Sequence, residues 1–111
     1  MRKRTTALLL VLAAVAVTAL PVAAATPKLP GSVGPGFTIA LKKPAKPGKY
    51  TLVIADRSDE HNFHLKGKGV NVKTGIAAVR TKSFAVTLVK ARYTFLCDAH
   101  PTTMKGAFTI R

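Results

Sequence analysis

Short runs of alternating apolar and polar residues recur along the chain from residue 37 onward. A period of two residues is typical of strands with one buried face, and no run after residue 25 has the 3.6-residue period of an amphipathic helix. Glycine, proline and polar residues separate the runs, as expected for turns. Strands are therefore predicted at six places: 37–41, 49–55, 62–65, 83–89, 92–97 and 106–110.

The spacing of these strands predicts one all-β domain over residues 37–111, arranged as a β-sandwich or a barrel. Residues 70–78 are weakly patterned and are expected to hold short extended pieces at most. Residues 26–36 contain three prolines and three glycines, which predicts a flexible linker leading into the domain. The alternation in the first strand is expected to bury three side chains: Phe37, Ile39 and Leu41.

The first 25 residues have a different pattern. Three basic residues precede an apolar run over residues 7–20, and small residues follow Pro21 up to Ala25. This order predicts a helical secretory signal peptide over residues 1–25, cleaved after Ala25. The apolar run is shorter than the roughly 20 residues of a spanning helix, so no stable membrane span is expected after cleavage. An uncleaved anchor is the alternative, and the mature domain is expected to be extracellular, in the cell envelope or periplasmic.

The segment with the most chemistry is Tyr-Thr-Phe-Leu-Cys-Asp-Ala-His-Pro-Thr-Thr-Met, residues 93–104. It contains the only cysteine of the chain, Cys97, followed by His100 and Met104. One cysteine cannot form an internal disulfide, so in an exported protein it indicates pairing with a partner, a reactive thiol or a metal ligand. A thiolate, an imidazole and a thioether together suit copper better than other common metals.

A second imidazole must come from His61 or His64. These residues are three apart, so on a strand they point to opposite faces. His61 shares its parity with Phe63 and Leu65, which both favour burial, so His61 is expected to point inward and His64 outward to solvent. Asn62 is expected to form a hydrogen bond to the 97–100 loop and to hold it in place.

Copper chemistry fits this set of side chains. A thiolate and two imidazoles form a trigonal plane around one copper ion, with a weak axial methionine, and serve both Cu(II) and Cu(I). Each residue alone also has an ordinary structural interpretation: Cys97 as a small buried apolar residue, Met104 as core filler and His100 as a surface histidine. Their combination at the ends of two predicted strands favours a metal site with His61, Cys97, His100 and Met104 as ligands.

Charge adds a constraint on partners. After the predicted cleavage, fifteen basic residues remain against four acidic ones. This balance favours acidic partner proteins or anionic cell surfaces. Nucleic acid is not expected, because the chain is exported and carries no known nucleic-acid-binding motif. The four acidic residues lie in sequence close to the suspected site: Asp56, Asp59, Glu60 and Asp98.

Two segments, His61-Asn62-Phe63 and residues 93–106, resemble the cupredoxins, the blue copper proteins that include plastocyanin, amicyanin and azurin. The resemblance covers about residues 37–110. It implies an eight-stranded Greek-key β-sandwich and a mononuclear type 1 copper site, with Met104 as the axial ligand. It further implies one-electron transfer through the exposed edge of the His100 ring. Three residues separate His100 from Met104, one fewer than in plastocyanin and one more than in amicyanin.

The leading hypothesis is therefore an exported, monomeric electron-transfer protein with one copper ion and an acidic redox partner. Two alternatives remain: copper delivery or sequestration without an electron-transfer partner, and a metal-free basic β-sandwich that binds an anionic cell-surface polymer. An enzyme is not expected, because four ligands leave no open position on the metal and no separate pair of nucleophile and base is evident.

Overall fold

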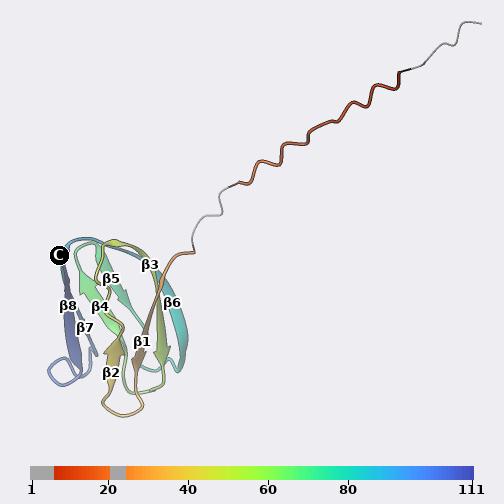
Figure 1. Cartoon of the computed structure of the whole chain (residues 1–111). Helices are drawn as coiled ribbons and strands as arrows, with labels where there is room; N and C mark the ends of the chain where they lie inside the picture. The colour runs from red at the N-terminus through yellow and green to blue at the C-terminus, as the bar shows by residue number, and fades with distance from the viewer. Residues whose placement is uncertain (1–6, 21–24) are drawn as a thin grey trace, which may run out of the picture.

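The computed structural model describes residues 7–20 and 25–111, and within these ranges the fold is all-β, as predicted (Figure 1). Eight strands form two sheets of four strands each. They are β1 (Lys28–Val33), β2 (Ile39–Leu41), β3 (Gly48–Asp56), β4 (His64–Gly67), β5 (Val70–Lys73), β6 (Arg80–Leu88), β7 (Ala91–Leu96) and β8 (Lys105–Ile110).

The first sheet has the strand order β2-β1-β3-β6 and the second has the order β5-β4-β7-β8. Strand β1 pairs antiparallel with β2 and parallel with β3, whereas every pair in the second sheet is antiparallel. The longest ladder joins β3 to β6, with Gly48 opposite Leu88 at one end and Asp56 opposite Arg80 at the other. Strand β3 is central in its sheet, because it has a partner on each side.

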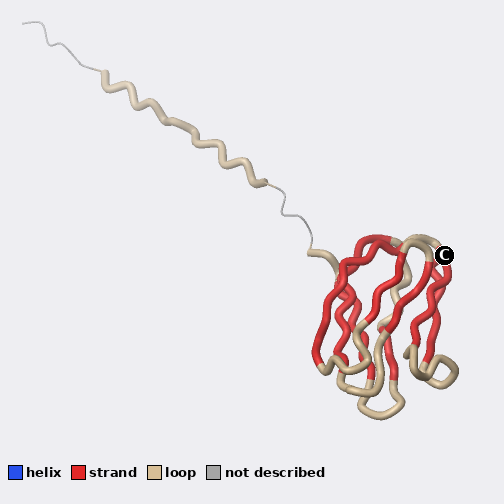
Figure 2. The backbone as a smooth tube through the Cα atoms, turned by 180° about the vertical axis from the view of Figure 1, so that it is seen from behind, coloured by secondary structure: helices blue, strands red, loops and turns tan. Residues whose placement is uncertain are grey.

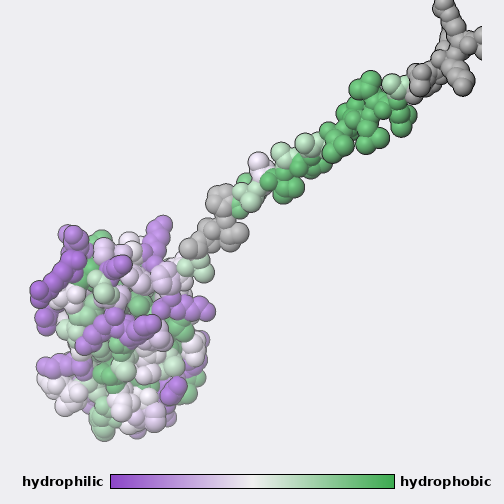
Figure 3. All heavy atoms as spheres, in the orientation of Figure 1, coloured by the Kyte–Doolittle hydropathy of each residue, from purple (hydrophilic) through white to green (hydrophobic). Residues whose placement is uncertain are grey.

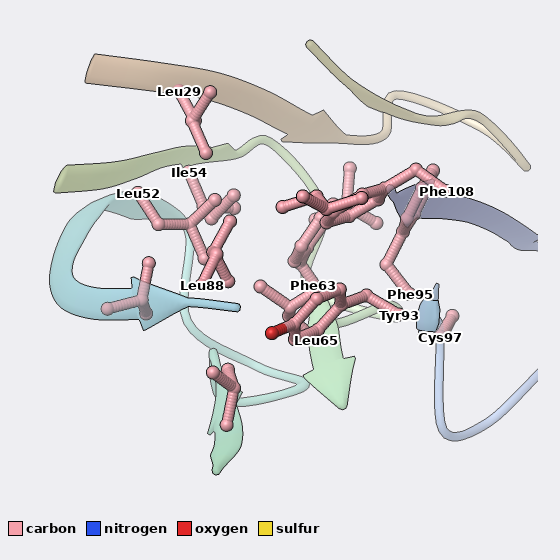
Figure 4. Close-up of a cluster of buried hydrophobic side chains, with 14 of the residues drawn as sticks. Leu29, Leu52, Ile54, Phe63, Leu65, Leu88, Tyr93, Phe95, Cys97 and Phe108 are labelled. Carbon is pink, nitrogen blue, oxygen red and sulfur yellow. The ribbon is translucent and has the colours of Figure 1, made fainter. Parts of the chain in front are cut away.

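The core lies between the two sheets and is built from alternate residues of the strands (Figure 4). Strand β3 contributes Leu52 and Ile54, and β7 contributes Tyr93 and Phe95, while the residues between them point away. This is the two-sheet arrangement of a β-sandwich. Cys97 lies at the edge of this apolar cluster in Figure 4 and is fully buried. Every member of the cluster falls between Leu29 and Ile110, so the core is complete without residues 7–20.

Two glycines let the aromatic rings of β7 lie flat across neighbouring strands. A Cβ atom on Gly67 would come within 2.1 Å of the Tyr93 ring, and one on Gly106 would come within 2.2 Å of the Phe95 ring. Both glycines therefore sit where a backbone must approach an aromatic ring closely. The packing places Phe95, two residues before Cys97, against Gly106, the second residue of β8.

The predicted flexible linker over residues 26–36 is wrong for residues 28–33, which form β1 between β2 and β3. Tertiary pairing overrides the local signal of Pro30 and Gly31 there, and a Cβ on Gly31 would meet the Ile54 side chain at 2.7 Å. The expected burial of Phe37 is also wrong. The strand begins only at Ile39, and Phe37 lies in the preceding turn with 67% of its surface exposed.

Residues 7–20 contain neither helix nor strand (Figure 2). Their large apolar side chains are exposed. The predicted helix of the signal peptide is therefore wrong for these residues. The basic residues 2–4 and the segment 21–24 before the predicted cleavage site lie outside the described residues. No helix long and apolar enough to cross a membrane occurs in residues 7–20 and 25–111. Cleavage after Ala25 remains a prediction.

Candidate metal centre

Two loops at one end of the sandwich bring the candidate ligands together. His61 lies in the 57–63 connection between β3 and β4, and Cys97 and His100 lie in the 97–104 connection between β7 and β8. Strands β4 and β7 are hydrogen-bonded neighbours, with His64 opposite Leu96. The two loops therefore leave the second sheet side by side, which places residues far apart in the sequence at one site.

The side chains of His61, Cys97 and His100 converge with their donor atoms facing one another. Nδ1 of His61 lies 3.1 Å from Nδ1 of His100, and Sγ of Cys97 lies 3.9 Å and 3.8 Å from these two nitrogens. These three atoms form a group that could hold a metal ion. The two imidazoles and the sulfur thus occur as the sequence predicts, with His61 rather than His64 as the second histidine.

The size of this triangle fits a bound metal ion. A point in the plane of the three atoms and equally far from each lies about 2.1 Å from all of them, close to the roughly 2.0–2.1 Å of a metal–imidazole bond and the roughly 2.3 Å of a metal–thiolate bond. An ion at that point would lie near the ligand plane. The three residues therefore fit a three-coordinate N₂S arrangement without rearrangement of their side chains.

Burial differs among the three residues. His61 and Cys97 are buried, with 2% and 0% of their surface exposed, whereas His100 is half-buried. The site is thus closed on the core side and reaches the surface through the ring of His100. The Cys97 sulfur is shielded from water and lies beside two imidazoles. Because a large substrate could not reach it, this sulfur is better suited to holding an ion than to reacting with such a substrate.

Phe37 covers this surface opening. Its ring centroid lies 5.0 Å from that of His61 and 5.1 Å from that of His100, and the two histidine rings are 4.7 Å apart. The three rings form a cluster of tilted and edge-on contacts, the geometry that aromatic pairs favour. Sequence reasoning missed this role because it placed Phe37 on a strand, although the Gly-Pro-Gly run before it is a turn signal.

The 97–104 connection is fixed by its own backbone. Cys97 N donates to Met104 O at 3.0 Å, and Met104 N donates to His100 O at 2.9 Å. His100 N also donates to Cys97 O, which closes a tight turn after the cysteine. Met104 is fully buried at the base of this loop. Its main chain is thus held beside the other candidate ligands, and its axial role remains a hypothesis.

Asn62 links the two loops, as expected from the sequence. Its Nδ2 donates to Asp98 Oδ2 at 2.8 Å, and Asp98 N donates back to Asn62 Oδ1 at 2.8 Å. The backbone N–H of Asn62 points at the Cys97 sulfur, with an N···S distance of 3.5 Å. This N–H is thus a hydrogen-bond donor to the sulfur and fixes the position of Cys97 relative to the His61 loop.

The expectation that His64 points out to solvent is wrong, because the residue is only 8% exposed. Its neighbour Leu65 faces the core, so His64 faces the opposite side of the sheet, where Asp98 and Asn71 cover it. Nδ1 lies 2.7 Å from Asp98 Oδ1, and Nε2 lies 2.6 Å from Asn71 Oδ1. Both ring nitrogens are engaged, so neither is available to a metal ion at the His61–Cys97–His100 cluster.

Asp98 is the charged member of this network. Partial desolvation raises the pKa of its carboxyl group, but hydrogen bonds from Asn62 and His64, with the charges of His64 and Lys73, outweigh it. The pKa therefore lies below its ordinary value, and Asp98 is ionised at neutral pH. The negative charge beside Cys97 thus has a structural use: it holds Asn62 and His64 in place.

A second carboxylate, the buried Asp56, fixes the His61 loop. Asp56 Oδ2 accepts a hydrogen bond from Thr74 Oγ1 at 2.8 Å, and the same hydroxyl oxygen accepts from Phe63 N at 2.9 Å. Asn62 Nδ2 also donates to Thr74 O. Asn62 and Phe63, the two residues after His61, are thus tied to Thr74. Sequence reasoning did not single out Thr74, because its segment is weakly patterned.

Comparison with known proteins adds no family to this description. No protein-family model matches the chain, and no curated protein matches it closely enough to be a relative.

Proposed function

We propose that this protein is a type 1 copper protein that carries single electrons, with the Greek-key sandwich of the cupredoxins. The observation that carries the proposal is the triangle formed by His61 Nδ1, His100 Nδ1 and Cys97 Sγ, which fits one ion in the plane of the three atoms. Thiolate with two imidazoles is the equatorial ligand set of blue copper sites. The bound copper would supply a reversible Cu(II)/Cu(I) couple.

The protein's part in this function is to keep the ligand geometry the same in both oxidation states. His61 and Cys97 are buried, Asn62 joins their two loops, and Thr74 anchors the loop that carries His61. Ligands held by packing and by hydrogen bonds move little when the charge of the ion changes. Little movement means a small reorganisation cost for each electron that enters or leaves.

Met104 completes the proposed ligand set as a weak axial ligand. It is fully buried, and its backbone is bonded to both Cys97 and His100. A thioether in that position suits a soft copper site. With four ligands from the protein, no position remains for a substrate, so the proposed role is transfer and not catalysis.

The half-buried His100 ring is the proposed route for electrons. Phe37 lies against it and is itself exposed, so a partner protein would meet the edges of these two rings first. The proposed partner is an acidic redox protein, which the net positive charge of the whole domain attracts at long range. The proposed setting is outside the cytoplasm, as the N-terminal pattern indicates.

The test is the spectrum of the copper-loaded chain beside that of a Cys97→Ser variant. A type 1 site gives an intense absorption band from charge transfer between thiolate and Cu(II), together with a narrow copper hyperfine splitting in electron spin resonance. The wild type should show both and should be reduced and reoxidised without loss of copper, whereas Cys97→Ser should lose the band. A wild type that stays colourless with Cu(II) would contradict the proposal.

A second measurement separates electron transfer from copper delivery, which would use the same residues. Two results together would support electron transfer. Copper should stay bound when the protein is incubated with a competing chelator, and electrons should pass rapidly between mixed oxidised and reduced samples of the protein. Rapid loss of Cu(I) to the chelator with slow self-exchange supports delivery instead.

A further inference from the structure

The end of the sandwich opposite the metal centre carries an unusually dense positive charge. In the first sheet, β1 and β3 begin at this end, and the β2–β3 connection turns there. These elements place four exposed cations on it: Lys28, Lys43, Lys46 and Lys49. Each lies in the first two residues of a strand or in the connection itself.

The second sheet adds as many cations at the same end. The β4–β5 and β6–β7 turns lie there, β7 begins there and β8 ends there. These elements carry four more exposed residues: Lys68, Lys90, Arg92 and Arg111. We refer to these eight residues, four from each sheet, as the basic pole.

The acidic residues of the chain all lie at the other end. Asp56 ends β3, Asp59 and Glu60 lie in the loop that carries His61, and Asp98 follows Cys97. No acidic side chain of this chain therefore lies among the eight cations of the basic pole. In Figure 3 the hydrophilic side chains gather over the half of the domain from which the N-terminal segment emerges, while the far end is less polar.

The apolar residues 7–20 join the domain at the basic pole. Only residues 21–27 separate this segment from Lys28, the first residue of β1 (Figure 1). Seven residues span roughly 25 Å at most. A bilayer that receives residues 7–20 therefore has the basic pole as the nearest part of the folded domain. Apolar residues followed by clustered cations are a typical arrangement at a membrane surface with anionic lipids.

We propose that the basic pole binds the anionic headgroups of a lipid bilayer and orients the domain on it. Strand β3 has nine residues, so the pole and the metal centre are roughly 26 Å apart along the strands. A domain that stands on its basic pole would present His100 and Phe37 away from the bilayer. The surface field of anionic lipids is screened within about 8 Å at physiological salt, so the field would act on the pole and leave the metal end untouched.

Vesicle sedimentation tests this orientation with the chain from Thr26 to Arg111, which keeps the whole core. The first variant reverses three cations of the pole, each in a different turn: Lys46→Glu, Lys68→Glu and Lys90→Glu. The control reverses three exposed cations at the other end of the sandwich by the same total charge: Arg57→Glu, Arg80→Glu and Lys105→Glu. Circular dichroism confirms that all three proteins are folded.

Wild type and control should sediment with vesicles that contain phosphatidylglycerol and not with pure phosphatidylcholine. The pole variant should bind at least about tenfold more weakly, because each cation contributes to attraction at an anionic surface. Added salt should weaken the binding of wild type. Equal losses in both variants would overturn the proposal, since they would show that only net charge matters.

Two further outcomes complete the test. Binding to a soluble polyanion such as dextran sulfate through the pole, without binding to anionic vesicles, would assign the pole to a cell-surface polymer and overturn the lipid proposal. The copper absorption of the pole variant should match that of wild type. Vesicle binding and the copper spectrum are thus separate measurements, so the failure of one proposal leaves the other standing.

Discussion

Asn62 and Asp98 exchange two hydrogen bonds, each 2.8 Å long, across the gap between the two loops that carry the candidate ligands. Each residue uses one donor and one acceptor, so neither loop can move away without breaking both bonds. The same Asn62 points its backbone N–H at the Cys97 sulfur. The pair therefore acts as a clasp that holds the distance between His61 and Cys97.

The first prediction concerns this clasp. In Asn62→Ala the backbone N–H of Asp98 loses its partner, and the free energy of unfolding should fall by about 2–3 kcal/mol. In a domain of this size that lowers the thermal midpoint by about 10 °C. Copper affinity should fall by about tenfold to a hundredfold, since residues that orient metal ligands typically contribute this much. Thermal melts and competition with a copper chelator measure the two effects. The control Asn71→Ala, which loses only a contact to His64, should keep copper affinity nearly unchanged.

The second prediction distinguishes the two histidines that precede and begin β4. His61→Gln should abolish the intense visible absorption of the copper-loaded protein, because one corner of the ligand triangle is lost. His64→Gln should keep that absorption and lower stability only, because both nitrogens of His64 are bonded to Asp98 and Asn71. The spectra of the two variants at equal copper loading decide the matter. Loss of the band in His64→Gln would show that the ligand assignment is wrong.

The third prediction concerns the exposed ring over the site. Phe37→Ala removes the contacts with His61 and His100 and should speed the transfer of copper to a chelator by about twofold to tenfold, as expected for aromatic contacts of about 0.5–1.5 kcal/mol. Stopped-flow measurement of copper loss tests this effect. Val89→Ala removes a partly exposed apolar side chain at the opposite end and should leave the rate unchanged. Equal rates in wild type and Phe37→Ala would show that the ring does not shield the ion.

The fourth prediction concerns the packing beneath Cys97. In Gly106→Ala the new Cβ would meet the Phe95 ring at 2.2 Å, so the ring must move, at a cost of about 1–3 kcal/mol in stability. Because Cys97 follows Phe95 by two residues, the copper absorption should also shift or weaken. Gly75→Ala is the matched control, since its nearest neighbour would be an ordinary contact at 3.5 Å. Chemical denaturation and absorption spectra of both variants give the comparison.

The sequence predicted the strands whose buried and exposed residues alternate. Strands β3, β6, β7 and β8 lie within a few residues of their predicted places, and Tyr93, Phe95 and Cys97 alternate on the buried face. Local alternation is sufficient there because each strand has one side in the core. The cluster of His61, Cys97 and His100 could be predicted because each residue lies close to the end of a strand. His61 precedes β4, and Cys97 and His100 follow β7.

What the sequence did not predict depends on contacts between distant segments. Strand β1 contains Pro30 and Gly31 and looks like a linker, but its pairing with β2 and β3 decides its structure. His64 does face away from the core, but residues from two other segments cover it, and strand parity says nothing about such cover. Phe37 was misplaced because the predicted strand began at residue 37, two residues before the true start of β2 at Ile39.

Strand β1 also has a consequence for the order of events during the proposed export. The carbonyl of Pro27 already accepts a hydrogen bond from Thr51 N at 2.9 Å, so the sheet begins two residues after the predicted cut at Ala25. A peptidase must bind several extended residues on both sides of the bond that it cleaves. Residues after the cut would be held in the sheet once β3 is in place. If the chain is cut at Ala25, processing has to come before β1 docks, and a protein that folds early would keep its leader.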